Sequence, residues 1–136
     1  MPAKMKRLAV VLGILQCFVA VMAVPAGLSL ILEPDGSGIG LPIEILQTSP
    51  FHDYLIPGLF LFVFNGMFQV IGAVASFRKS KHTGMLGLGL GVILLLWILI
   101  QVYFTGLVHF LQPLFFLIAI IEIMLGRRLH SIEASR

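Results

Sequence analysis

One long uncharged stretch constrains the fold of this chain more than any other feature. From Tyr54 to Phe77 the sequence contains no Asp, Glu, Lys or Arg. The stretch exceeds the roughly 20 residues that an α-helix needs to cross the hydrocarbon core of a bilayer. We therefore predict a transmembrane helix over these residues.

The residues just before this stretch contain signals for a helix start. Ser49 is a suitable N-cap, Pro50 fits a first helical turn, and Asp53 would face the positive end of the helix dipole. The helix is therefore predicted to begin near Pro50. Within it, polar and small residues recur at spacings of four, three and four, which places them on one face that should meet protein. They are Asn65, Gln69, Gly72 and Ser76.

Composition extends the membrane interpretation to the whole chain. Of 136 residues, 59% are hydrophobic and only 11% are charged, which is far from the balance of soluble domains. We expect one all-α transmembrane domain over 1–136 with an outer loop over 33–53. Its four spans are predicted at about 8–32, 54–77, 84–104 and 107–125.

The basic residues predict the orientation. All nine Lys and Arg residues fall before the first span, between the second and third, or after the fourth. Under the positive-inside rule, both termini are cytoplasmic and the protein is a multi-pass protein of the cytoplasmic (inner) membrane. Because these cations form short clusters beside spans, no nucleic-acid partner is expected.

Two segments allow alternative interpretations. The basic start and the apolar run as far as Val24-Pro25-Ala26 also fit a cleaved signal peptide, although the run continues to Leu32 and favours a retained helix kinked at Pro25. Residues 39–46 are apolar enough for a short interfacial helix, and the alternative is an ordinary loop.

Small and polar residues also form stripes on the first and third predicted spans. This pattern allows close helix approach in a membrane, and it predicts an antiparallel four-helix bundle. The stripes are Gly13, Gln16, Ala20, Ala23 and Gly27 in the first span, and Gly84, Gly87, Gly91, Leu94, Ile98, Gln101 and Thr105 in the third.

Candidate binding residues fall at two depths. Gln16 and Gln69 lie at the same predicted level, where they can hydrogen-bond to each other, and Asn65 lies deeper. A buried amide needs a partner, which can be protein, water or ligand. Nearer the outer face, a second level is predicted from Gln101, His109 and Gln112, with His52, Asp53 and Tyr54 close to it. The alternative is that these residues bond loop backbone or lipid headgroups.

Glu122 is the only acidic residue within a predicted span. Carboxylates inside a membrane are candidates for function. Because Glu122 is about one turn from the cytoplasmic end, pairing with Arg127, Arg78 or Lys79 is favoured over proton coupling.

No established catalytic or metal pattern is present. The single cysteine, Cys17, offers neither a disulfide nor a thiolate cage, and the histidines lack metal-ligand spacing. Trp97, Tyr103 and Tyr54 are interpreted as packing or interfacial aromatics. We expect no metal, no cofactor and no enzymatic activity.

Two stretches resemble a group of small four-span prokaryotic membrane proteins of uncharacterised function. The stretches are YLIPGLFLFVFNG at 54–66 and WILIQVYFTG with the following LQPLFF at 97–116. The resemblance covers about half the chain and rests on Pro57, Gly58, Asn65, Gly66, Trp97, Gln101, Gln112 and Pro113. It implies the four-span fold and no particular activity.

These observations favour a binding or accessory subunit in the membrane. Its partners would be the lipid bilayer and either another membrane protein or further copies of the chain. The alternative is a homo-oligomeric small-molecule transporter that uses the intramembrane Gln and Asn residues with Glu122 as a proton site. A membrane enzyme that uses His109 or His52 with Asp53 is a third hypothesis.

Overall fold

The structure is a computed structural model that describes residues 3–106 and 111–134. All regular structure in these residues is helical, and they contain no strand. The α-helices are α1 (Ala3–Leu32), α2 (Leu55–Phe60), α3 (Phe68–Phe77), α4 (Thr83–Thr105) and α5 (Leu111–Ala134). Two short 3₁₀-helices, η1 (Ser37–Ile39) and η2 (Ile43–Thr48), lie between α1 and α2, and a π-helical segment, η3 (Leu61–Met67), joins α2 to α3.

Three helical segments are long and apolar enough to cross a membrane. They are Ala3–Leu32, Leu55–Phe77 and Thr83–Thr105, which match the first three predicted spans. The predicted fourth span begins at residues 107–110, which lie outside the described residues. From Leu111 onward this part of the chain is helical, and the helix continues beyond the predicted span to Ala134.

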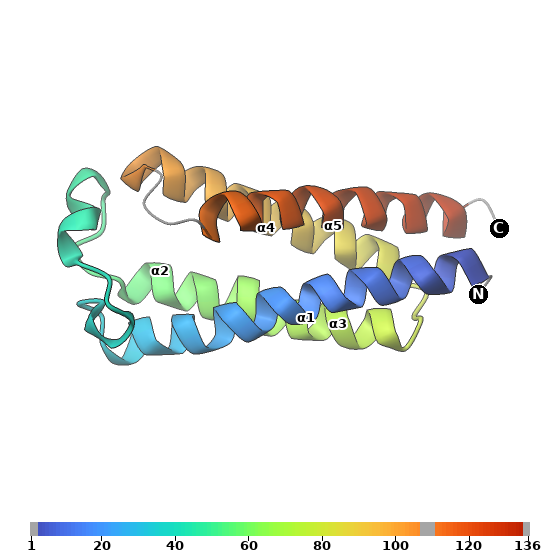
Figure 1. The fold of residues 1–136 in the computed structure, drawn as a ribbon, viewed down its shortest axis with the longest axis horizontal. Helices are drawn as coiled ribbons and strands as arrows, with labels where there is room; N and C mark the ends of the chain where they lie inside the picture. Colours follow the sequence, from blue (N-terminus) through green and yellow to red (C-terminus); the bar gives the residue numbers. More distant parts are fainter. Residues whose placement is uncertain (1–2, 107–110, 135–136) are drawn as a thin grey trace.

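The helices pack in two pairs. Figure 1 shows α1 beside the segment from α2 to α3, and α4 beside α5. Glycines set the first contact, since a Cβ on Gly27 would lie 2.7 Å from the backbone nitrogen of Phe62. In the second pair, a Cβ on Gly91 would lie 2.9 Å from the backbone nitrogen of Ile123. Such backbone approach is typical of helices that associate in membranes.

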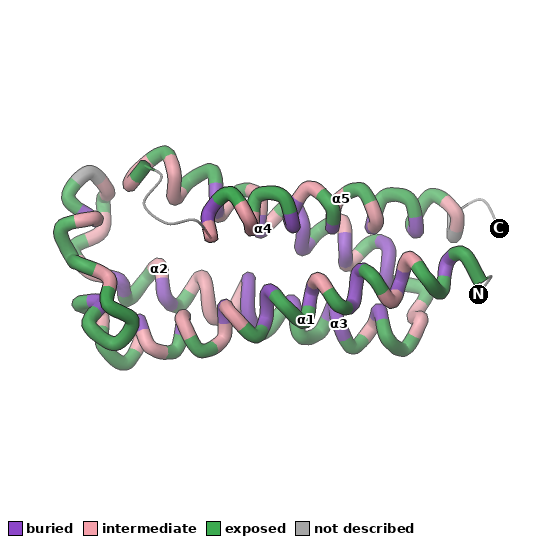
Figure 2. Tube along the Cα trace, in the orientation of Figure 1, coloured by how far each residue is buried: buried purple, intermediate pink, exposed green. Residues whose placement is uncertain are grey.

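The predicted small and polar stripes face the interior of the molecule. Figure 2 shows buried positions recurring along the inner sides of the helices. The stripe of α1, the stripe that includes Asn65, and the third-span stripe from Gly84 to Ile98 are all buried, whereas Gln101 and Thr105 are half-buried. The prediction that these faces meet protein is therefore confirmed.

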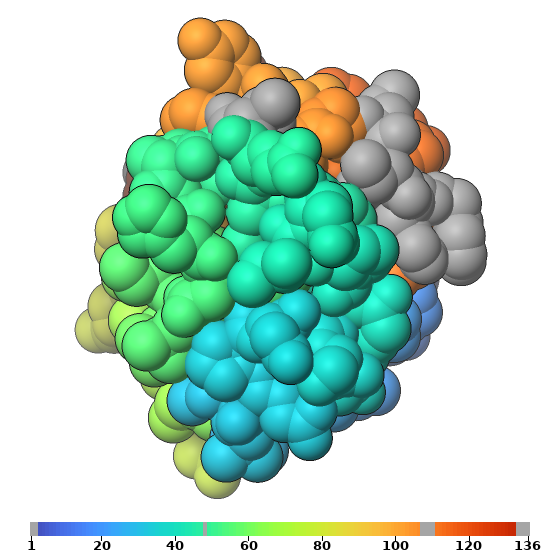
Figure 3. All heavy atoms as spheres, turned by 90° about the vertical axis from the view of Figure 1, so that its left-hand side faces the viewer, coloured from blue at the N-terminus to red at the C-terminus, as the bar shows by residue number. Residues whose placement is uncertain are grey.

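The segment between α1 and α2 covers one end of the molecule, as Figure 3 shows. Leu30, Leu46 and Tyr54 form a buried apolar cluster there. The Tyr54 hydroxyl donates a hydrogen bond to the Pro42 carbonyl at 2.7 Å, and its backbone N–H donates to the Pro34 carbonyl at 2.8 Å. Residues 39–46, predicted as an interfacial helix or a loop, contain the last residue of η1, a non-helical stretch and the first four residues of the 3₁₀-helix η2.

The predicted helix start near Pro50 is wrong, because α2 begins at Leu55. Ser49 instead closes η2, where its hydroxyl donates to the Leu46 carbonyl at 2.8 Å. The two bonds of Tyr54 hold this residue against the loop, so the preceding residues do not join the helix. Asp53 nevertheless caps the start, because its carboxylate accepts the Leu55 N–H at 3.1 Å.

Replacing Tyr54 with phenylalanine removes the hydrogen bond to Pro42. We expect the free energy of unfolding to fall by about 1 kcal/mol. Burial, with a smaller contribution from nearby Glu44, raises the pKa of the Tyr54 phenol. Tyr54 therefore stabilises the folded state at pH values below the ordinary phenol pKa, and this stabilisation is lost as the pH rises through the folded-state pKa of Tyr54. Tyr54→Phe has no phenol at this position and should not show this loss. Thermal unfolding of both proteins across alkaline pH tests this, with Tyr103→Phe as control because Tyr103 is 82% exposed.

Candidate ligand-binding cavity

A cavity of about 390 Å³ lies toward the end of the molecule that η2 covers. Its walls come from both helix pairs. The larger apolar side chains that line it include Met22 and Leu30 from α1, Leu46 from η2, Leu61 from η3, Trp97 and Ile98 from α4, and Phe115 from α5. Its size falls within the range of small-molecule sites in proteins, which are also mainly apolar.

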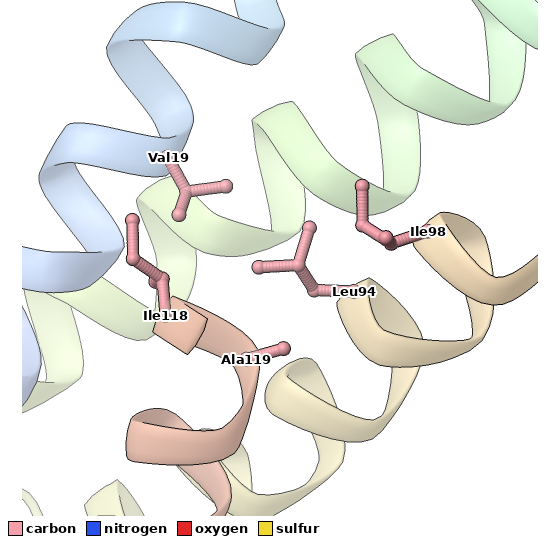
Figure 4. Close-up of a cluster of buried hydrophobic side chains, with 5 residues drawn as sticks. All are labelled: Val19, Leu94, Ile98, Ile118 and Ala119. Atoms are coloured by element: carbon pink, nitrogen blue, oxygen red, sulfur yellow. The ribbon is translucent and has the colours of Figure 1, made fainter. Parts of the chain in front are cut away.

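An apolar cluster forms the floor of the cavity. Figure 4 shows Val19, Leu94, Ile98, Ile118 and Ala119 converging from α1, α4 and α5. The first three of these side chains also line the cavity. Val19 lies one turn beyond Gln16, and Ala119 lies one turn before Glu122. The cluster therefore separates the cavity from these deeper polar side chains.

Asn65 is the most unusual residue that lines the cavity. Its side chain is fully buried, and neither Nδ2 nor Oδ1 has a hydrogen-bond partner among the described residues. An unmade buried hydrogen bond typically costs about 1–3 kcal/mol. Asn65 also lies within the π-helical segment η3, and π-helical turns frequently occur at functional sites. Asn65 therefore places one buried donor group and one buried acceptor, both without a partner among the described residues, in the mainly apolar wall of the cavity.

A second polar group lies at the cavity wall. Gln112 donates through Nε2 to Gln101 Oε1 at 2.9 Å and to the Gly106 carbonyl at 3.3 Å. The structure thus brings together two of the three residues predicted for the outer polar level. The third, His109, lies outside the described residues. Tyr54 lines the cavity, whereas His52 is exposed.

Aromatic pairs join the two helix pairs beside the cavity. The ring of Phe60 in α2 stacks on the indole of Trp97 in α4, with centroids 5.1 Å apart and planes at 13°. Phe18 in α1 meets Phe115 in α5 edge to face, with centroids 6.2 Å apart. Trp97 and Phe115 line the cavity directly. These contacts therefore connect the two helix pairs at side chains that line the cavity or lie beside it.

The predicted hydrogen bond between Gln16 and Gln69 is not among the bonds of the described residues. Gln16 Oε1 instead accepts a bond from the Ser76 hydroxyl at 2.7 Å. Gly72 explains this arrangement, because a Cβ at that position would lie 2.7 Å from Gln16 Nε2. The absence of a side chain lets the Gln16 amide lie against α3 and reach Ser76.

The favoured ion pairing of Glu122 is also wrong. Its side chain is fully buried, and its Oε2 accepts a hydrogen bond from Gln69 Nε2 at 3.2 Å. The proposed partners Arg127 and Arg78 are exposed, and Lys79 Nζ donates to the Phe77 carbonyl. Because α5 continues well past Glu122, the carboxyl group lies inside the packed helices rather than at a helix end.

No protein-family model matches the chain, and no curated protein or solved structure matches it significantly. The geometry of the cavity is therefore the main basis for assigning a function. Sequence reasoning identified Asn65, Gln101 and Gln112, but it missed the apolar walls of the cavity. The aromatic residues Trp97 and Phe115 carried a partial signal, because both of these large side chains line the cavity.

Proposed function

We propose that this chain is a binding protein of the cytoplasmic membrane that holds a lipophilic small molecule in the cavity beside Asn65. In this proposal, the helices form an antiparallel four-helix transmembrane bundle with both termini in the cytoplasm. Three helices of membrane-spanning length and the distribution of Lys and Arg support this arrangement. The single observation that carries the function is the buried Asn65 amide, which has no hydrogen-bond partner among the described residues.

The lining of the cavity favours a particular ligand chemistry. The walls are apolar apart from a few hydroxyl and amide groups, so an aliphatic or aromatic body fits them. A primary or secondary amide on the ligand would both accept from Asn65 Nδ2 and donate to Asn65 Oδ1. The ligand class is therefore a lipophilic molecule with one compact group that donates and accepts hydrogen bonds.

Binding is favoured over catalysis by the residues around the cavity. The described lining contains no Asp, Glu, His, Lys, Arg or Cys side chain. Those side chains supply most general acids, bases and nucleophiles in enzymes. The hydroxyl groups of the lining, on Ser49, Tyr54 and Thr105, each donate to a backbone carbonyl and have no acidic or basic side chain of the lining beside them, which favours binding over reaction.

Bromine quenching of Trp97 fluorescence tests the proposed function. Trp97 is the only tryptophan in the chain, and it lines the cavity. With the protein in nanodiscs, a long-chain primary amide brominated on its alkyl chain should quench the emission saturably. The same bromoalkane without the amide should quench weakly and in proportion to its membrane concentration.

The matched variant for this test is Ala26→Phe, which adds a ring to a residue that lines the cavity. We expect this variant to lose the saturable part of the quenching, because the added ring fills ligand space. Equal quenching of the wild-type protein by the amide and by the bromoalkane would contradict the proposed function.

A second candidate function is proton-driven transport by a homo-oligomer. The observation that favours it is the buried Glu122 carboxyl, which is bonded to Gln69 one helical turn from Asn65. Under this proposal, Glu122→Gln would abolish ligand flux into vesicles while leaving binding at the cavity intact. Under the binding or accessory-subunit proposal, the protein carries no flux, and crosslinking would identify another membrane protein or further copies of the chain.

A further inference from the structure

Gln69 and Glu122 form a polar contact between the two helix pairs. Gln69 belongs to α3, which packs on α1, and Glu122 belongs to α5, which packs on α4. Both side chains are fully buried. The amide Nε2 of Gln69 donates to Glu122 Oε2 at 3.2 Å, and this contact joins segments that are far apart in the sequence.

Each of the two side chains also has an oxygen without a partner. Neither Glu122 Oε1 nor Gln69 Oε1 has a hydrogen bond among the described residues. A buried acceptor oxygen without a hydrogen bond is energetically unfavourable, and this pair contains two of them. A single proton on Glu122 would give both oxygens a hydrogen bond, because a carboxylic acid and a primary amide can pair through two hydrogen bonds in a closed ring.

We propose that Glu122 is a proton-binding site inside the membrane, in which the bound proton lies on Oε1 and is donated to Gln69 Oε1. The amide bond to Oε2 is already present, so only the second bond of the ring must close. Loss of the proton leaves two facing acceptors and a buried negative charge, which opens the ring. The site takes a proton and releases it unchanged, with no other reactant.

The surroundings of Glu122 contain no competing charge among the described residues. From Leu55 to Phe77 and from Gly84 to Val102, the facing helices carry no titratable side chain. On α1, the only such residue between Leu8 and Leu32 is Cys17, which is exposed. The nearest cations on α5, Arg127 and Arg128, are exposed. A buried carboxylate without a counter-ion is costly, so these surroundings favour the protonated form.

The site also acts between the two halves of the molecule. Protonation adds a hydrogen bond between α3 and α5, whereas deprotonation removes it and leaves a charge at the contact. The proton therefore favours the closed packing of the helix pairs. This inference concerns Glu122 and Gln69 alone, and it holds whether or not the cavity binds the proposed ligand.

Infrared spectroscopy of the full chain tests the inference. The protein would be placed in vesicles of ether-linked phospholipid, which lacks ester carbonyls that overlap with protonated carboxyl groups. We expect a carboxylic-acid C=O band near neutral pH that shifts in D₂O and disappears in Glu122→Gln. That variant should fold, because a glutamine at this position supplies the same donor and acceptor pattern as the protonated acid.

Two further variants give the band a specific interpretation. Gln69→Leu should move it to higher frequency, because the C=O group loses its hydrogen bond. Glu44→Gln should leave it unchanged, because Glu44 is exposed in η2. The inference is overturned if the wild-type protein shows only carboxylate bands near neutral pH, or if the protonated band persists in Glu122→Gln.

Discussion

Replacing Gly91 with leucine is expected to separate α4 from α5 and to lower the free energy of unfolding by about 3 kcal/mol. A Cβ at this position would lie 2.8 Å from Ile123 Cγ1, 2.9 Å from the Ile123 backbone nitrogen and 3.0 Å from the Ala119 carbonyl oxygen. Two of these three atoms belong to backbone and cannot move without displacing α5. The side chain therefore forces the helices apart.

Gly89 provides a matched control two residues away on the same helix. A Cβ on Gly89 would meet nothing within 4 Å, and the residue is exposed. Gly89→Leu adds the same side chain with the same helix propensity, but without the clash. Unfolding of both variants in detergent, followed by circular dichroism, separates the two effects. Equal stability of the two variants would show that α4 and α5 do not pack through Gly91.

Replacing Asn65 with leucine is expected to have opposite effects on stability and on ligand binding. Because neither amide atom has a hydrogen-bond partner among the described residues, the substitution should raise the free energy of unfolding by about 1–3 kcal/mol. A ligand that hydrogen-bonds to Asn65 should at the same time bind at least about tenfold more weakly, since tenfold corresponds to only about 1.4 kcal/mol. Such a conflict between stability and activity is common at functional sites.

Two measurements on one preparation test this prediction. Unfolding reports the stability, and saturable quenching of Trp97 by the brominated amide reports the binding. Leu61→Met is the control, because it nearly conserves the volume of an apolar residue that lines the same cavity. A loss of stability in Asn65→Leu would show that the amide has a structural partner instead of a ligand.

The helical class and the inward faces could be predicted from the sequence because both depend on local patterns. The uncharged runs are long enough for spanning helices, and the spacing of Asn65, Gln69, Gly72 and Ser76 places them on one helix face. These four residues are buried, as that spacing requires. The predicted stripe on α1, from Gly13 to Gly27, is buried for the same reason.

The partners of the polar side chains could not be predicted in the same way. Depth along two helices placed Gln16 and Gln69 at one level, but the missing side chain of Gly72 lets Gln16 reach Ser76 instead. Glu122 appeared shallow because the predicted span ended soon after it, whereas α5 continues to Ala134. Such contacts depend on how helices rotate and extend, which single-helix periodicity does not specify.

The cavity and the π-helical segment required the structure. The cavity arises because α1, α2, η3, α4 and α5 contribute walls that are distant in sequence. Nothing in the local composition of residues 61–67 distinguishes a π-helix from an α-helix. The Phe60–Trp97 stack likewise depends on how α2 approaches α4, although the sequence alone suggested that Trp97 serves in packing or at the membrane interface.

Native mass spectrometry of the full chain released from nanodiscs tests the central claim most directly. If the chain binds a lipophilic molecule beside Asn65, the wild-type protein will retain a mass that differs from the nanodisc lipids, and Asn65→Leu will lose it. The Leu61→Met control will keep it. If the wild-type protein and Asn65→Leu carry the same lipids and no additional mass, the account of Asn65 as a ligand-binding residue is wrong.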